Sequence, residues 1–291
     1  MTRYKHSNYT TEDGKKLFLR EWLPENEPGA VILYIHGLGS HGGRLDHWAE
    51  RFVSEQIAFY AFDQRGHGKS DGKRGHPTNI SYMINDVRTM TNHIRKLFPG
   101  LPIILYGHSL GGAIAINYVI STTYTVDGLI VTSPWLKLVS PPPPLLIRIV
   151  SLLQKIVPGI TLSNKLDPKD ISGDELEVQK YINDPLVHDR ISIGLFNSAY
   201  EAGYNALRNV YKINCPLLIM HGTGDRITSA KASEGYVMNT SNRTRLKLWK
   251  GAFHELHHEP IRDDVFNYII NWLKENHFVQ PAVVKHHEIP D

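Results

Sequence analysis

Short, uninterrupted apolar runs alternate along the chain with stretches whose apolar residues recur every three or four positions. The runs lie at residues 30–35, 57–62, 101–106, 128–132 and 216–220. Uninterrupted apolar runs of this length predict strands that are covered on both faces. The stretches between them, at 45–53, 84–97 and 113–118, show the spacing of amphipathic helices. This alternation predicts an α/β fold with a mostly parallel central sheet and helices on both faces.

The two ends of the chain extend this pattern. Alternating apolar and polar residues at 16–22 predict an early antiparallel strand. Near the other end, a helix at 229–238 and a strand at 246–249 precede a last helix that carries Val265, Phe266, Ile269 and Leu273. The tail at 280–291 has few core residues, and we expect it to be mobile.

After residue 133 the alternation stops until residue 216. Four prolines at 141–144 form a stiff spacer before the very apolar stretch 145–157. As a helix, that stretch has only a narrow polar stripe of Arg148, Ser151 and Lys155. Further helices are predicted at 176–181 and 191–210. We therefore predict a core of residues 1–133 and 212–279, with a helical cap of residues 134–211 inserted in it.

Composition narrows the class of protein. The 291 residues are 41% hydrophobic, enough for one large domain with an insertion, and the small net charge of +3 is scattered, which argues against nucleic-acid binding. The single cysteine, Cys215, excludes an internal disulfide and suits a reducing compartment. With no secretion signal or membrane-spanning run, we expect a cytoplasmic protein. A peripheral membrane contact through the cap stays open, and the sequence does not indicate an oligomeric state.

The chemistry is first suggested by residues 107–112, Gly-His-Ser-Leu-Gly-Gly. This Gly-x-Ser-x-Gly pattern lies between a predicted strand and a predicted helix, the context of a nucleophile elbow. Gly107 and Gly111 lack β-carbons, so the strand and the helix can approach closely around Ser109. A serine needs a base that removes its proton, and the alternative is an ordinary glycine-rich turn. The catalytic interpretation therefore depends on partners elsewhere in the chain.

Two later strands provide such partners. Asp225 follows the strand that ends near residue 220, and His254 follows the last strand. The order Ser109, Asp225, His254 is that of the α/β-hydrolase triad. For the oxyanion hole we predict the backbone N–H groups of Leu38 and Leu110, with Gly37 and Gly39 as alternatives to Leu38. Each residue alone also has a structural explanation, such as Asp225 capping a turn.

Several motifs together resemble the monoacylglycerol lipase family, which is related to lysophospholipase-like and serine-aminopeptidase-like hydrolases. They lie at residues 36–44, 63–70, 107–112, 181–186 and 254–257. The resemblance implies that Arg44, His108, Tyr181 and His257 hold a glycerol head group, a set that suits a diol in an otherwise apolar pocket. Arg44 could instead pair at a helix start, and Tyr181 could simply pack in the cap. Ser40 departs from the family, because mammalian members carry a glutamate there.

These observations favour a serine hydrolase that cleaves the ester of a monoacylglycerol or related lipid through an acyl-enzyme. A broader carboxylesterase or lysophospholipase is the alternative, and a non-catalytic lipid-binding module is a remote one. No cofactor is expected. We also expect no metal site, because the pairs His257–His258 and His286–His287 lack the spacing and further ligands that zinc requires. The apolar cap helix could line an acyl tunnel, rest on a membrane or pack on the core.

Overall fold

The computed structural model describes residues 2–77, 79–121, 126–240 and 243–279. Across these residues the main sheet has the strand order β1-β2-β4-β3-β5-β6-β9-β10. β1 and β2 are antiparallel to their neighbours, and the other strands run parallel. The bounds are β1 (Arg3–Thr10), β2 (Lys16–Leu23), β3 (Ala30–Ile35), β4 (Ile57–Phe62), β5 (Ile103–His108), β6 (Gly128–Thr132), β9 (Leu217–Gly222) and β10 (Thr244–Trp249).

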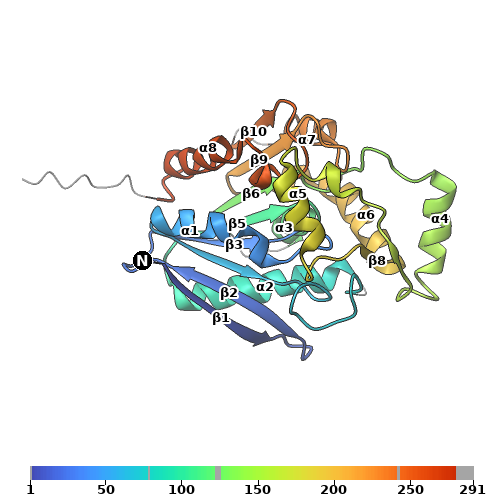
Figure 1. Cartoon of the computed structure of the whole chain (residues 1–291), viewed down its shortest axis with the longest axis horizontal. Helices are drawn as coiled ribbons and strands as arrows, with labels where there is room; N and C mark the ends of the chain where they lie inside the picture. The colour runs from blue at the N-terminus through green and yellow to red at the C-terminus, as the bar shows by residue number, and fades with distance from the viewer. Residues whose placement is uncertain (1, 78, 122–125, 241–242, 280–291) are drawn as a thin grey trace, which may run out of the picture.

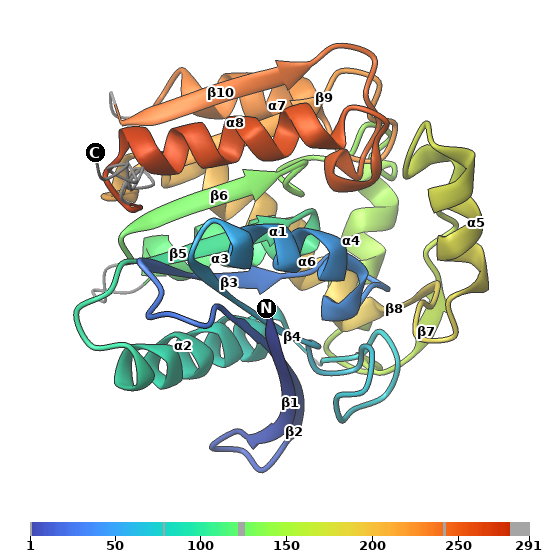
Figure 2. The same ribbon diagram turned by 60° about the vertical axis from the view of Figure 1, so that its left-hand side comes forward.

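Helices cover both faces of this sheet (Figures 1 and 2). On one face, α1 (Asp46–Ser54) and α8 (Arg262–Glu275) bury a cluster that contains Trp48, Phe52 and Phe266 against the strands. On the other, α2 (Ile80–Leu97), α3 (Leu110–Ser121) and α7 (Ala230–Val237) pack on the opposite side chains of the same strands. The predicted fold class, a mostly parallel sheet between two helical layers, is confirmed.

The edge strand β1 was not predicted from the sequence. It pairs with β2 in continuous register, from Arg3 opposite Leu23 to Thr10 opposite Lys16. Almost every residue of β1 is exposed, so it carries no apolar period that could reveal it. β1 is held by backbone hydrogen bonds to β2, and the local pattern of apolar residues in β1 does not reveal this pairing.

Between β6 and β9 the chain forms the inserted segment. It contains α4 (Pro144–Leu153), β7 (Thr161–Ser163), α5 (Glu175–Asn183), β8 (Arg190–Ser192) and α6 (Ile193–Arg208). The predicted helix at 191–210 is wrong at its start, because Arg190–Ser192 pair with β7 as a strand. Ser192 then caps α6 by accepting a hydrogen bond from Leu195 N.

The helices of this insertion differ in how they are held. α6 packs on α3 and contributes Leu195, Ala199 and Ala202 to the core cluster of that face. α4 contributes no buried residue, and several of its apolar side chains are exposed. The boundaries at residues 134 and 211 stay predictions, and the tail at 280–291 lies outside the described residues. Short 3-10 helices complete the structure at Gly42–Leu45, Pro168–Asp170, Val210–Lys212 and Leu256–His258. Among the described residues, no helix has both the length and the hydropathy to cross a membrane.

Candidate active site

Ser109 occupies the sharp turn between β5 and α3. Its φ of 54° lies in the left-handed region, a strained conformation for a residue with a β-carbon. The neighbouring glycines make the turn possible. A β-carbon on Gly107 would lie 2.5 Å from Gly111 O, and one on Gly111 would collide with the carbonyl oxygen of Ile35. Backbone hydrogen bonds from Ser109 N to Thr132 O and from Trp135 N to Ser109 O fix the turn against β6.

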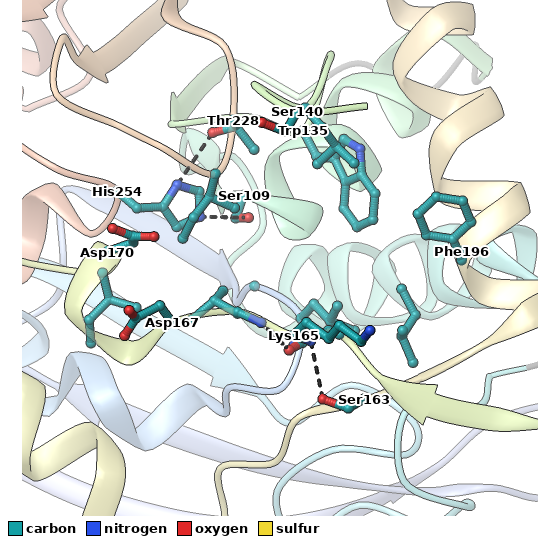
Figure 3. A pocket seen from close by; sticks show the side chains of 18 of the residues that line it. Ser109, Trp135, Ser140, Ser163, Lys165, Asp167, Asp170, Phe196, Thr228 and His254 are labelled. Atoms are coloured by element: carbon teal, nitrogen blue, oxygen red, sulfur yellow. Dashed lines mark hydrogen bonds between the residues drawn. The ribbon is translucent and has the colours of Figure 1, made fainter. Parts of the chain in front are cut away.

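His254 and Asp225 lie in line with this serine. His254 Nε2 is 2.9 Å from Ser109 Oγ (Figure 3). His254 Nδ1 is 2.7 Å from Asp225 Oδ2. All three residues are buried, and each comes from a loop or turn directly after a parallel strand. Carboxyl ends of parallel strands gather at one sheet edge, so the fold brings together residues that are 145 positions apart. This is the geometry of a nucleophile, a base and an orienting acid.

The carboxylate of Asp225 is held from several sides. Its Oδ1 accepts from Ile227 N at 2.7 Å and from Thr228 N at 3.0 Å. Its Oδ2 accepts from Thr228 Oγ1 at 2.9 Å and lies 3.0 Å from His221 Nε2. The other ring nitrogen of His221 is 2.9 Å from Ser233 Oγ. Sequence reasoning missed His221 and Thr228, although both lie within four residues of Asp225.

The charges of this triad reinforce one another. Burial raises the pKa of Asp225, but the attraction of His254 and the hydrogen bonds of His221 and His254 lower it by more. Burial lowers the pKa of His254, but Asp225 raises it above its ordinary value. Asp225 is therefore ionised and favours the protonated form of His254, the form that arises when the serine gives up its proton. The arrangement suits nucleophilic attack by Ser109.

The predicted oxyanion donors lie on either side of Ser109. Leu110 is the first residue of α3, so its N–H has no acceptor within the helix. Leu38 lines the same cavity as Ser109. His36 fixes this loop: its Nε2 accepts from Gln64 N at 2.9 Å, which leaves Nδ1 to donate to Gly37 O at 2.8 Å. The loop passes so near the serine that a β-carbon on Gly37 would lie 3.2 Å from Ser109 Cβ.

The four residues predicted to contact a substrate lie together but are not equally accessible. His108 and Tyr181 are among the residues that line the cavity, whereas Arg44 and His257 are not. Arg44 is under the Tyr181 ring, with its guanidinium 4.8 Å from the ring centroid. The ring centroids of His108 and His257 are also 4.8 Å apart. Burial raises the pKa of Tyr181 to about 12 and lowers that of His108 to about 3, so both are neutral.

A buried acid that the sequence did not single out completes this cluster. Arg44 Nη2 donates to Glu255 Oε2 at 2.6 Å, and His258 Nδ1 lies 2.7 Å from the same oxygen. Among the described residues, His108, Glu255 and His257 offer three possible metal-ligand atoms within 4.8 Å of one another. However, the guanidinium of Arg44 already neutralises the carboxylate and would repel a second cation. This cluster therefore fits a neutral polar ligand better than a metal ion.

The cavity in front of Ser109 has a volume of about 540 Å³. Trp135 and Phe196 form part of its apolar wall, opposite the strip that contains Asp167 and Lys165 (Figure 3). Residues of α4, β7 and α6 close it from the insertion side; they include Leu146, Val150, Leu162 and Ile193. A cavity of this size and lining accepts an elongated apolar group with a small polar end.

The chain is similar to several known proteins. The model of the protein family described as serine aminopeptidase, S33, matches residues 26–261. The chain is 36% identical over 273 residues to an uncharacterized abhydrolase domain-containing protein of Dictyostelium discoideum; the match covers 92% of this chain and 29% of that protein. It is 31% identical over 278 residues to the monoacylglycerol lipase of Mycolicibacterium smegmatis, covering 94% of this chain and 99% of the relative. The crystal structure of Paleococcus ferrophilus monoacylglycerol lipase matches with a TM-score of 0.83 and 32% identity, over 89% of this chain and 99% of that one.

Proposed function

The chain belongs to the serine aminopeptidase (S33) family. On this premise, and because proteins named monoacylglycerol lipase match it along nearly their whole length, we propose that it hydrolyses monoacylglycerols to fatty acid and glycerol. One observation carries the chemistry: the hydrogen-bonded line from Ser109 through His254 to Asp225 at the floor of an apolar cavity. An ester with one long chain and one small polar end fits that cavity.

The reaction follows from the contacts. Ser109 Oγ attacks the ester carbonyl while His254 Nε2 takes its proton, and Asp225 stabilises the imidazolium that forms. The negative charge on the carbonyl oxygen is stabilised by the N–H groups of Leu110 and Leu38. His254 then returns the proton to the leaving glycerol oxygen, which leaves an acyl-enzyme. A water molecule that gives its proton to His254 attacks this acyl group, and the fatty acid leaves as Ser109 regains its proton.

For the alcohol we propose contacts with His108, Tyr181, Arg44 and His257. His108 and Tyr181 reach the cavity directly, and both keep neutral polar groups that can exchange hydrogen bonds with hydroxyls. His257 Nδ1 is buried without a hydrogen-bond partner among the described residues, so a ligand hydroxyl or a water molecule can supply one. These contacts support a glyceride more than a simple ester, although a broader carboxylesterase would use the same triad.

We also propose that the insertion at residues 134–211 acts as a cap that meets a membrane through α4. Leu145 and Leu152 of α4 are 70% and 64% exposed, and Ile156 just after it is 78% exposed. Such a cluster is unusual on a surface that faces only water. Leu146 and Val150 of the same helix line the cavity, so a lipid that leaves the bilayer at α4 has a short path to Ser109.

Replacing Ser109 with alanine tests the catalytic proposal. The smaller side chain fits the turn, so we expect normal folding by circular dichroism and a loss of hydrolysis of at least about a thousandfold. A fluorophosphonate probe should label the wild type with one equivalent and the variant not at all. Full activity in the purified variant would contradict the proposal. A substrate panel of monoacylglycerols, lysophospholipids and nitrophenyl esters then distinguishes the lipase from the broader esterase.

A further inference from the structure

A carboxylate that the catalytic scheme does not use lies beside the catalytic histidine. Glu255 follows His254 in the chain, and its side chain is only 5% exposed. It nevertheless belongs to the residues that line the cavity. Burying a carboxylate is costly unless partners compensate for the lost water. Because this carboxylate lies at the wall of a mainly apolar cavity, it needs partners that stabilise it, and it could also contact a substrate.

One oxygen of Glu255 is fully engaged. Arg44 Nη2 donates to Oε2 at 2.6 Å, and His258 Nδ1 lies 2.7 Å from it. His258 Nε2 is in turn 3.0 Å from Arg44 O, so the three residues form a closed group. Burial raises the pKa of Glu255, but Arg44 and His258 lower it well below its ordinary range. The carboxylate is therefore ionised, and it can accept hydrogen bonds but not donate them.

The second oxygen is available. Glu255 Oε1 forms no hydrogen bond among the described residues, because both hydrogen-bond contacts of this carboxylate are at Oε2. The acid lies with His108 and His257 in a group whose polar atoms are within 4.8 Å of one another. The His108 ring is itself 4.8 Å from the ring of His254. Glu255 is thus on the side of the cavity where His254 passes its proton to the leaving alcohol.

We propose that Glu255 is a specificity-determining residue, whose Oε1 accepts a hydrogen bond from a free hydroxyl of the leaving alcohol while Arg44 holds Oε2. This inference rests on the proposed function, because it requires an ester whose alcohol keeps a hydroxyl. A monoacylglycerol keeps two, whereas a propyl ester of the same fatty acid keeps none. Ser40 lines the same cavity but is uncharged, and the carboxylate that pairs with Arg44 there is that of Glu255.

The experiment compares two substrates on one enzyme preparation. kcat/KM is measured for a monoacylglycerol and for the propyl ester of the same acid, both below their aggregation concentrations, and their ratio gives the hydroxyl preference. Loss of folded enzyme cancels from this ratio. In Glu255→Gln the amide oxygen faces Arg44 and the NH₂ group faces the cavity, so the acceptor is lost. We expect the ratio to fall about ten- to a hundredfold, the value of a hydrogen bond to a charged group.

Two further variants separate recognition from stability. Asp86→Asn removes the negative charge from a comparably buried pair with Arg65, on α2 and away from the cavity, and should lower stability without changing the ratio. The double variant Arg44→Met/Glu255→Leu removes both charges, so no buried charge is left unpaired, and should lose the preference as Glu255→Gln does. An unchanged ratio in Glu255→Gln would overturn the inference. A wild type without any preference for the monoacylglycerol would instead overturn the proposed glyceride substrate.

Discussion

The hydrogen bond from His221 to Asp225 can be removed without touching a group that reacts. The Asp225 carboxylate accepts from five donors, and His221 Nε2 supplies one of the three at Oδ2, at 3.0 Å. Leucine at position 221 is close to histidine in size but has no hydrogen-bond donor. We expect His221→Leu to fold, because four donors remain and the position is otherwise packed in the interior.

The contacts of Asp225 set the size and the sign of two expected changes, one in stability and one in the pH profile. A hydrogen bond to a charged group contributes about 1.5–3 kcal/mol to stability, so His221→Leu should lower the free energy of unfolding by about that amount. The acid limb of the pH profile should move in a defined direction. Without His221, more of the negative charge on Oδ2 is available to His254, so the pKa of His254 rises further above its already raised value. If half of a lost 1.5 kcal/mol is transferred to the contact between Asp225 and His254, the pKa of His254 rises by about half a unit.

The assay is a profile of kcat/KM against pH for a soluble ester, with Ser233→Ala as the matched control. Ser233 binds the other nitrogen of His221, at 2.9 Å, and leaves the contact with Asp225 in place. In the proposed mechanism neutral His254 is the active base, so activity should increase as pH rises through its pKa. The acid limb of His221→Leu should lie about half a unit higher than that of the control. A limb that stays in place or moves to lower pH in the folded variant refutes this explanation.

Two further results are expected. Gly111→Ala places a β-carbon against a backbone carbonyl of β3 and should lower the free energy of unfolding by more than about 3 kcal/mol, whereas Gly235→Ala, in open space on α7, should raise it by about 0.5–1 kcal/mol; urea unfolding measures both. Leu145→Ser/Ile156→Ser should weaken binding to phosphatidylcholine vesicles by at least about tenfold, whereas Met238→Ser, equally exposed on the core, should not. Equal sedimentation of all three proteins with vesicles would contradict the membrane proposal.

Much of the sheet could be predicted because its strands are buried on both faces. Three predicted runs, at 30–35, 57–62 and 128–132, have the bounds of β3, β4 and β6. Where one face or both faces meet water, the prediction weakened or failed. β1 shows no apolar period at all, and β8 was assigned to the helix that follows it, since three residues are too few to establish a period.

The residues of the candidate site likewise fall into those that the sequence could predict and those that it could not. Ser109, Asp225 and His254 could be predicted to lie together because each has a fixed place after a strand, and strand order determines which loops meet. Glu255 and His221 could not, because their significance depends on partners that only the folded chain brings near. Glu255 looks like a surface acid until Arg44, 211 residues away, is placed against it. Long-range pairs of this kind leave no local spacing by which to find them.

The insertion is attached firmly at one side of the cavity and weakly at the other. Near α5, His41 Nε2 on the loop after β3 is 2.8 Å from Asp184 Oδ2, and His188 N donates to Gly39 O at 3.0 Å. These contacts tie the part of the insertion that carries Tyr181 to the loop that approaches Ser109. α4, on the acyl side, contributes no buried residue. In the proposed reaction, a displacement of α4 would therefore change the entry of the acyl chain while leaving in place the groups that we propose contact the alcohol. Selectivity for the head group can thus be strict even where the acyl chain is not.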